Sequence, residues 1–284
     1  MHDEVVVGVT YDGSFRVMAA HMSETCRTIA QAQGVQATEA MHLGELVTAT
    51  TLFRVTMAPK YRVQGILKAT NQTGHYVADA HPEGWCRGLV SRRDASIPLT
   101  LGKGSLLQMM RTLPRGELQQ GVVELDADSS ISGALVAYLS TSEQVVSSAD
   151  VVCGIDSHGN VVRAAGYIVQ LLPEAPEQAL AIMTARLETD FQDLSSRLAV
   201  WDGSAEVLLG EILYGMPYEI TSRNPIRYEC NCSRVRVLAS LGTLGKPDIL
   251  ELTQSGKPLE IGCDYCGADY VIRPAELRGL LESS

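Results

Sequence analysis

Four cysteines near the C-terminal end of the sequence form two tight pairs. Cys230 and Cys232 make a C-x-C motif, thirty residues follow, and Cys263 and Cys266 make a C-x-x-C motif. Each motif brings two sulfurs within reach of one ion, and two such motifs together complete the tetrahedral S₄ set that binds Zn²⁺. The last histidine is His158, so the predicted ligand set is all-thiolate. Such a set is closed, which argues against a catalytic zinc with an open water position.

The same four sulfurs also predict redox chemistry. Zinc holds cysteines as thiolates, which is the form that reacts with oxidants. A disulfide within the C-x-C pair lies near the outer limit of disulfide reach, so it would be strained and easily reduced. A structural metal clamp and a redox switch can therefore share these atoms.

Composition describes a globular protein with a sizeable core. The chain has 284 residues, of which 45% are hydrophobic and only 5% aromatic. This length allows one large domain and something smaller. The start is acidic, no signal peptide is recognisable, and no run of 18 apolar residues occurs. We expect a cytoplasmic protein whose cysteines stay as thiols or bind metal.

Charge argues against two classes of partner. The net charge is −10, which gives no footprint for nucleic acid or for an anionic membrane. From residue 230 to the end we count six basic and seven acidic residues. A zinc module that reads nucleic acid would normally be basic.

Hydrophobic patterns predict an α+β fold over residues 1–172, with a mixed, mostly antiparallel sheet and helices. A hairpin is expected from Glu4–Thr10 and Ser14–Ala19, turning at Asp12-Gly13. Helices are expected from about Met22 to Gly34, from Glu39 to Phe53, and from Ile131 to Ser140 with Ser129 or Ser130 as its cap. The other predicted strands are Tyr61–Thr70, Gly74–Ala80, Gly88–Arg92, Leu106–Arg111, Gln120–Leu125, Ala149–Ile155 and Val161–Leu172.

Residues 173–229 have the character of a helical linker. Apolar residues recur at spacings of three and four from Leu180 to Leu198, which predicts one amphipathic helix that ends before Trp201-Asp202-Gly203-Ser204. A second short helix is expected over Val207–Tyr214. Residues 230–284 then form a small zinc-binding domain, whose core is so limited that zinc would supply much of its folding free energy.

Other motifs give no catalytic site, and we predict that the chain is not an enzyme. Gly102-Lys103-Gly104-Ser105 lacks the Walker spacing, because Ile97 stands where the upstream glycine is required. Neither H-E-x-x-H nor G-x-S-x-G occurs. The three remaining cysteines, Cys26, Cys86 and Cys153, are isolated and are expected to be small buried hydrophobes.

The chain resembles the redox-regulated holdase chaperones of the 33-kilodalton heat-shock protein family. The specific part of the resemblance is Cys230-Asn231-Cys232-Ser233-Arg234 together with Cys263-Asp264-Tyr265-Cys266-Gly267. Supporting motifs are Leu43-Gly44-Glu45-Leu46, Ser142-Glu143-Gln144, and Gly166 followed by Gln170 and Pro173. Two departures are Val235, where an acidic residue is usual, and Ala165, where the first of two glycines is usual; neither removes a ligand.

The resemblance implies an ATP-independent chaperone that binds unfolding client proteins. It implies that Cys230, Cys232, Cys263 and Cys266 bind one Zn²⁺ in the reduced, inactive state. On oxidation it implies disulfides between Cys230 and Cys232 and between Cys263 and Cys266. It also implies an N-terminal domain for substrate binding and dimerisation, a helical linker, a C-terminal redox-switch domain, and a homodimeric active form.

Three rival interpretations remain open at this point. The cysteine region could be a zinc-ribbon-like module that binds nucleic acid or a partner protein. It could be a thiol-disulfide oxidoreductase using Cys263 and Cys266, which requires an exposed thiol of low pKa in a zinc-free site. The chain could also be a constitutive holdase whose zinc is only structural.

Overall fold

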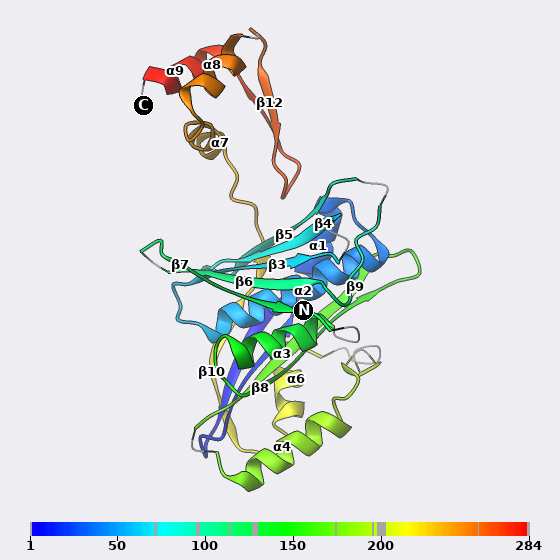
Figure 1. The fold of residues 1–284 in the computed structure, drawn as a ribbon. Helices are drawn as coiled ribbons and strands as arrows, with labels where there is room; N and C mark the ends of the chain where they lie inside the picture. The colour runs from blue at the N-terminus through cyan, green and yellow to red at the C-terminus, as the bar shows by residue number, and fades with distance from the viewer. Residues whose placement is uncertain are drawn as a thin grey trace. The chain divides into compact units, whose positions relative to one another are not determined.

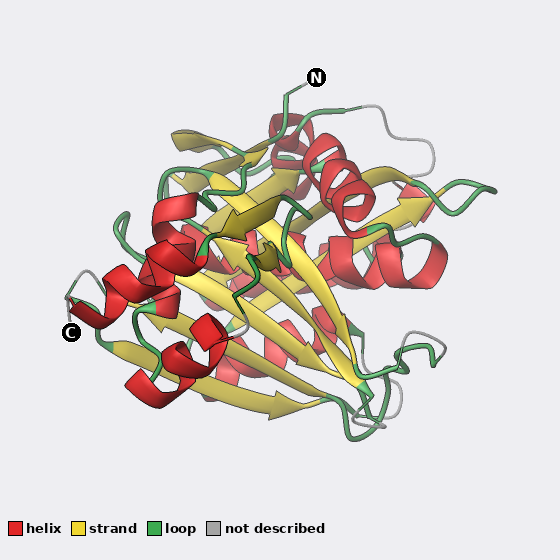
Figure 2. Cartoon of the chain, turned by 90° about the horizontal axis from the view of Figure 1, so that it is seen from above, coloured by secondary structure: helices red, strands yellow, loops and turns green. Residues whose placement is uncertain are grey.

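The chain forms two compact units, Met1–Glu229 and Cys230–Ser284, in this computed structural model. The structure describes residues 2–70, 73–94, 97–113, 115–126, 130–173, 175–194, 196–197, 203–254 and 256–282. It confirms the predicted α+β class, with antiparallel sheets and helices in the first unit and a cysteine cluster in the second (Figures 1 and 2).

Two sheets build the first unit. Sheet A has the order β10-β1-β2-β9-β8 and sheet B the order β11-β5-β4-β3-β6-β7. All neighbours are antiparallel except β11 and β5. The strands of sheet A are β1 (Glu4–Thr10), β2 (Phe15–His21), β8 (Ser147–Ile155), β9 (Val161–Leu171) and β10 (Tyr218–Pro225). Those of sheet B are β3 (Arg62–Lys68), β4 (Gly74–Ala80), β5 (Trp85–Arg92), β6 (Leu106–Thr112), β7 (Leu118–Glu124) and β11 (Arg227–Tyr228).

Helices α1 (Ser23–Gln33) and α2 (Ala37–Thr56) fill the space between the two sheets (Figure 1). Helix α3 (Ile131–Thr141) packs along β8 and β7. The side chain of Ser130 caps α3, which confirms one of the two predicted cap residues. The other, Ser129, lies outside the described residues. Helix α1 ends at Gly34, whose left-handed backbone (φ 61°) accounts for the predicted stop.

From Leu46 to Val55 helix α2 is buried on all sides, because it lies between the two sheets. Its apolar residues therefore surround the axis instead of forming one stripe. Gly44 allows the closest approach: a Cβ atom there would lie 2.4 Å from the Cys153 sulfur of β8. The largest apolar cluster of the protein, which we call the inner cluster, runs through α1, α2, α3 and the facing sides of both sheets.

A second apolar cluster, the outer cluster, covers the opposite face of sheet A. Helices α4 (Glu177–Thr189) and α6 (Ala205–Ile212) lie on this face (Figure 1). The ring of Phe191 meets that of Tyr167 on β9 edge to face, with the ring centres 5.9 Å apart. The cluster consists of Val6, Phe15, Val17, Ala19, Ala165, Tyr167, Val169, Met183, Phe191, Leu194, Ala205, Leu208, Leu209, Ile212 and Leu213.

Two expectations for residues 173–229 were wrong. The predicted long helix ends at Thr189, because the chain turns there to bring Phe191 and Leu194 onto sheet A. Leu198, Trp201 and Asp202 lie outside the described residues. The stretch predicted as a helical linker, residues 173–229, also contains the strand β10, which pairs with the whole of β1. The C-terminal half of β10 is polar and mostly exposed, because β10 is an edge strand. Its alternation of apolar and polar residues is therefore weak.

The second unit is small and has its own core. It contains α7 (Arg234–Leu241), α8 (Lys246–Gln254), β12 (Leu259–Gly262), β13 (Asp269–Ile272) and α9 (Pro274–Glu282). Strands β12 and β13 form an antiparallel hairpin. Only Leu241, Ile249, Ile272 and Leu277 are buried in its apolar cluster, among the residues that the structure describes.

Candidate metal centre

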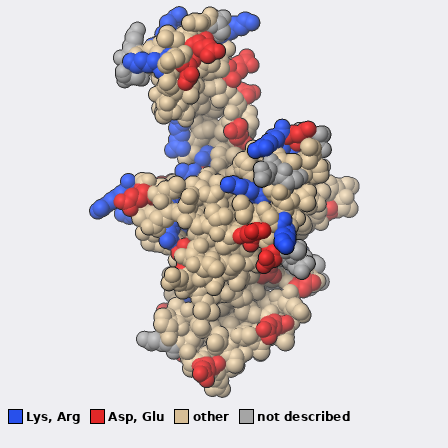
Figure 3. All heavy atoms as spheres, in the orientation of Figure 1, with Lys and Arg blue, Asp and Glu red and all other residues tan. Residues whose placement is uncertain are grey.

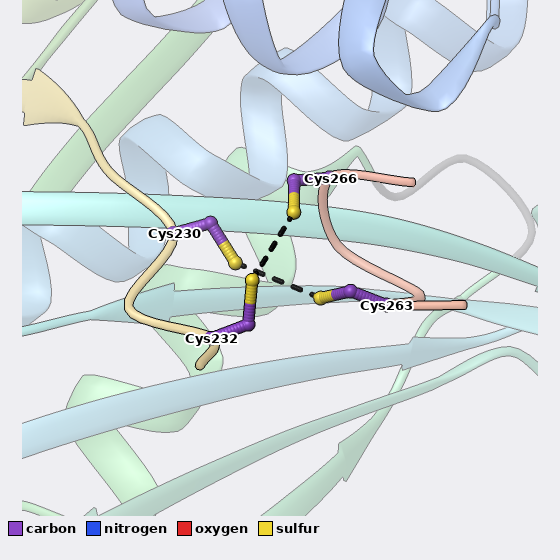
Figure 4. Close-up of side chains that lie close together, drawn as sticks. All are labelled: Cys230, Cys232, Cys263 and Cys266. Atoms are coloured by element: carbon purple, nitrogen blue, oxygen red, sulfur yellow. Dashed lines mark hydrogen bonds between the residues drawn. The ribbon is translucent and has the colours of Figure 1, made fainter. Parts of the chain in front are cut away.

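The two cysteine motifs come together in the second unit. The sulfurs of Cys230, Cys232, Cys263 and Cys266 all lie within 4.8 Å of one another (Figure 4). The Cys230 sulfur is 3.7 Å from that of Cys263, and the Cys232 sulfur is 3.4 Å from that of Cys266. Each of these short contacts joins one motif to the other. The four side chains thus point toward a common centre.

The sulfur spacing fits a tetrahedral zinc site. Four sulfurs at about 2.3 Å from a central Zn²⁺ lie about 3.8 Å from one another. The short contacts of 3.4 and 3.7 Å are close to that separation. An all-thiolate donor set favours zinc or another soft metal over magnesium or calcium. The four cysteines can therefore hold one metal ion.

The C-x-x-C motif forms a tight turn at the end of the hairpin. The backbone N–H groups of Cys266 and Gly267 both donate to the Cys263 carbonyl, and Cys263 N–H donates to Ala268. Gly267 adopts φ 69°, a left-handed conformation that suits glycine. Backbone hydrogen bonds thus fix the positions from which the Cys263 and Cys266 side chains project.

The C-x-C motif leads directly into helix α7. Ser233 caps this helix, with its hydroxyl accepting a hydrogen bond of 3.3 Å from the Arg236 N–H. The next residue, Arg234, forms a two-nitrogen ion pair with Glu276 of α9. These contacts tie the segment after Cys232 to the helix that follows the second motif.

The thiols of the site depend on one another electrostatically. Burial raises the pKa of Cys266 to about 12, and hydrogen bonds with Cys232, Cys230 and Cys263 act in the same direction. The Cys266 thiol therefore keeps its proton unless a cation lies beside it. The Tyr270 hydroxyl donates to the Cys232 sulfur at 3.0 Å. The sequence analysis missed Tyr270, for which the only signal was its position four residues after Cys266.

The other three cysteines belong to the first unit. Cys26, Cys86 and Cys153 are buried in the inner cluster, as predicted. Burial raises the pKa of the Cys26 thiol to about 12, which makes this sulfur a poor target for oxidants. The structure thus separates four clustered, half-buried thiols from three that are fully buried.

Surface charge on the second unit is mixed. Both basic and acidic side chains appear on its visible face (Figure 3). Arg234 and Glu276 neutralise each other there. Among the described helices of the chain, none has the length and apolar character that a membrane span requires.

Comparisons with known proteins agree with one another. A family model described as Hsp33 protein matches residues 3–273. The chain is 29% identical over 294 residues to a 33 kDa chaperonin of Thermoanaerobacter sp. (strain X514), covering 99% of this chain and 98% of the relative. It is 27% identical over 290 residues to the 33 kDa chaperonin of Syntrophotalea carbinolica, covering 99% of this chain and 100% of the relative.

A solved structure has the same fold. The crystal structure of the 33 kDa chaperonin (heat shock protein 33 homolog) of Thermotoga maritima superposes with a TM-score of 0.81. The match covers 100% of this chain and 99% of that chain at 22% sequence identity. At this identity the likeness speaks for the fold alone.

Proposed function

This chain belongs to the Hsp33 family of chaperones, and we propose that it is a redox-regulated holdase. In this proposal the protein binds unfolding client proteins without ATP after its cysteine centre has been oxidised. The observation that carries the proposal is the gathering of four sulfurs from two motifs in a unit that has only a small apolar core.

Cys230, Cys232, Cys263 and Cys266 are the proposed zinc ligands of the reduced state. A bound Zn²⁺ supplies the positive charge that keeps four neighbouring sulfurs as thiolates, and its binding adds folding free energy. The second unit needs this contribution, because four buried side chains alone give little stability. The Tyr270 hydroxyl stabilises the Cys232 sulfur by donating a hydrogen bond.

Oxidation by a peroxide is the proposed trigger. Each pair of thiolates gives two electrons to one H₂O₂, which takes up two protons from the solvent and becomes two water molecules while a sulfur–sulfur bond forms. The proposed pairs are Cys230 with Cys232 and Cys263 with Cys266. Once paired, the sulfurs can no longer serve as four thiolate ligands, so the link between the two motifs is lost and the second unit unfolds.

The outer cluster is the proposed client-binding surface. Helices α4 and α6, with Phe191 and Leu194 between them, cover the outer face of sheet A, yet Met183 is the only buried residue of α4. Uncovering this face would expose apolar side chains such as Phe15, Val17 and Tyr167 without disturbing the inner cluster. A contiguous exposed apolar surface is what binds unfolding proteins.

The remaining assignments follow from the same proposal. Residues 1–172 bind clients and dimerise, residues 173–229 act as the releasable cover, and residues 230–284 are the redox switch. The active form is a homodimer in the cytoplasm, with no catalytic turnover and no nucleic-acid partner. The mixed charge of the second unit gives no support to the nucleic-acid alternative.

The test compares two samples of the full chain in an aggregation assay with a heat-unfolded client. One sample is reduced and zinc-loaded, the other is peroxide-treated, and zinc release is followed in both. We expect only the oxidised, zinc-free sample to suppress aggregation. Equal activity in both samples would leave a constitutive holdase without a switch, and activity in neither would contradict the holdase itself.

Matched cysteine variants locate the switch. Cys232→Ser removes one of the four sulfurs, so zinc should bind more weakly and suppression should begin without oxidant. Cys86→Ala removes a thiol buried in the inner cluster and should leave peroxide activation unchanged. If Cys86→Ala abolished activation and Cys232→Ser did not, the switch would not be at the proposed site.

A further inference from the structure

Two motifs that play no part in the metal centre meet at one cavity of the first unit. Glu143 and Gln144 line it from the loop after α3, and Gln170 and Pro173 line it from the end of β9. The cavity has a volume of about 680 Å³ and lies at the C-terminal end of α2. That size falls within the range of small-molecule sites in proteins, about 300 to 1,000 Å³.

Arg16 brings a positive charge into the cavity. It lies on the α2 side of sheet A, because its neighbours Phe15 and Val17 belong to the outer cluster. Its guanidinium donates to the Thr56 and Val55 carbonyls, both at 3.3 Å, at the end of α2. Two of its five N–H groups suffice for these bonds. No carboxylate of the described residues pairs with Arg16, and burial lowers the pKa of its guanidinium.

Gln170 places a carboxamide next to this guanidinium. The two residues stand directly opposite each other in the β2–β9 pairing, so their side chains are neighbours on one face. Gln170 is only 8% exposed, yet its side chain takes part in no hydrogen bond within the described chain. Its amide atoms reach the open side of the cavity, where water or a ligand can take up their hydrogen bonds. The bonds to the end of α2 account for part of the position of Arg16. They do not account for a carboxamide at Gln170.

The other described residues that line the cavity do not offer a site for a charged group, so such a group can bind only beside Arg16 and Gln170. Glu143 already uses both oxygens, one accepting from Arg111 at 2.7 Å and the other from the Tyr138 hydroxyl at 3.3 Å. Much of the remaining lining is apolar and includes Leu139 and Val145. At one end the cavity therefore combines a guanidinium that pairs with no described carboxylate and an amide that bonds to no described residue, with aliphatic surface beside them.

We infer that this cavity binds the carboxylate of an aliphatic ligand. The ligand carboxylate accepts hydrogen bonds from the Arg16 guanidinium and the Gln170 amide, and its aliphatic part lies against Leu139 and Val145. Two sources share this chemistry: the C-terminal residue of a peptide and a free short-chain fatty acid. All of its residues belong to the first unit, so the site is separate from the cysteine centre of the second unit.

Calorimetric titration of the reduced, zinc-loaded full chain tests the inference. The probes are N-acetyl-leucine for a peptide end, hexanoate for a fatty acid, N-acetyl-leucinamide without the charge, and acetate without the aliphatic part. We expect N-acetyl-leucine, hexanoate or both to bind with a dissociation constant on the order of 1 mM or lower, and the other two at least about tenfold more weakly. Which acid binds identifies the source.

Two variants test the assigned residues. Gln170→Glu supplies a carboxylate beside Arg16 from the protein itself, so binding should weaken about tenfold or more while the melting temperature stays the same or rises. Arg16→Gln should weaken binding by a similar factor. Arg93→Gln, at an exposed arginine outside this cavity, is the matched control and should change nothing.

Three results would overturn the assignment. One is N-acetyl-leucinamide binding as tightly as N-acetyl-leucine, which would remove the role of the charge. Another is unchanged acid binding in a folded Gln170→Glu variant. The third is the absence of measurable binding for both acids at tens of millimolar, well above the expected dissociation constant on the order of 1 mM.

Discussion

The two compact units of this protein are stabilised in different ways. The first contains the inner cluster, in which α2 is enclosed between two sheets and residues such as Leu46, Leu52 and Phe53 are fully buried. Among its described residues, the second has four buried apolar side chains and four clustered cysteines. Burial of apolar area grows with the size of a unit, so the smaller one depends on additional links. The comparison indicates that one unit can unfold while the other remains folded.

Removal of the metal should affect the two units most differently, and this is the largest effect that we expect. Structural zinc sites contribute on the order of 10 kcal/mol of binding free energy to folding. A strong chelator added to the reduced chain should therefore unfold the second unit and leave the first intact. Limited proteolysis with trypsin measures this, because cleavage after Arg234, Arg236 and Arg278 should become fast while a fragment near 1–229 persists.

The control for that experiment is the same chelator with excess zinc restored, which should protect the second unit again. Simultaneous digestion of both units would contradict independent stability. Full resistance of both units would show that the four sulfurs are not what holds the second unit together.

A cavity in the inner cluster should produce the next largest effect. Leu46→Ala removes a fully buried side chain from a helix held between two sheets, where the neighbours cannot close the gap. We expect a loss of about 4 kcal/mol in the free energy of unfolding of the first unit. Urea denaturation measures it, with Leu180→Ala on α4 as the control, because Leu180 is 40% exposed. An equal loss in both variants would contradict the enclosed position of α2.

A substitution in the outer cluster should cost less stability than the one in the inner cluster. Leu209→Ala on α6 removes a fully buried side chain that packs against Gly8 of β1, but this helix has a sheet on one side only. Since α6 can shift to close part of the gap, we expect a smaller loss of about 2 to 3 kcal/mol. The loss should loosen the cover of sheet A, so aggregation suppression should rise in the reduced, zinc-loaded chain. Unchanged inactivity of a loosened variant would mean that this face does not bind clients.

A half-buried carboxyl should make the first unit sensitive to pH. Burial, and then the negative charge of Asp150, raise the pKa of Glu45 to about 8. Because the folded chain then binds this proton more tightly than the unfolded chain, stability falls as the pH rises from the ordinary value of 4.5 to about 8. The fall is at most about 1.4 kcal/mol for each pH unit.

The variant Glu45→Gln should remove most of this slope. Its free energy of unfolding should match that of the unchanged chain near pH 5 and exceed it near pH 8, as measured by urea denaturation at both pH values. Part of the slope should remain, because burial also raises the pKa of Asp150. Identical slopes in the two proteins would place the titrating group elsewhere.

Local patterns in the sequence predicted much of the first unit. The hairpin of β1 and β2, the three helices through α3 and the strands β3 to β9 follow from alternation, helical spacing and turn residues. Strand β10 could not be predicted in this way, because its partner β1 lies at the other end of the unit and its own alternation is weak. The end of α4 at Thr189 was also missed, since packing of Phe191 on Tyr167 overrides a continuing helical pattern.

In the candidate site, too, local features could be predicted from the sequence, whereas contacts between distant segments could not. The spacing of the four cysteines suggested one cluster, because ligand spacing is a local property that survives without knowledge of the fold. Tyr270 and the pair of Arg234 with Glu276 depend on how α7, β13 and α9 meet, which no local pattern encodes. Arg16 and Gln170 are directly opposite in space although they are far apart in the sequence, so their cavity was equally invisible.

The ion pair of Arg234 and Glu276 should give the smallest effect and the sharpest test of how weak the second unit is. Both side chains are partly exposed, at 44% and 32%, so solvent screening keeps their attraction weak. Because only four apolar side chains are buried among the described residues of this unit, even a weak link matters, and Glu276→Gln should release zinc to a chelator about two- to fivefold faster. The control is Glu24→Gln, which breaks the exposed pair with Arg27 in the first unit and should leave zinc release unchanged. If neither variant altered the rate, the contact between α7 and α9 would not be part of what keeps the metal-binding motifs together.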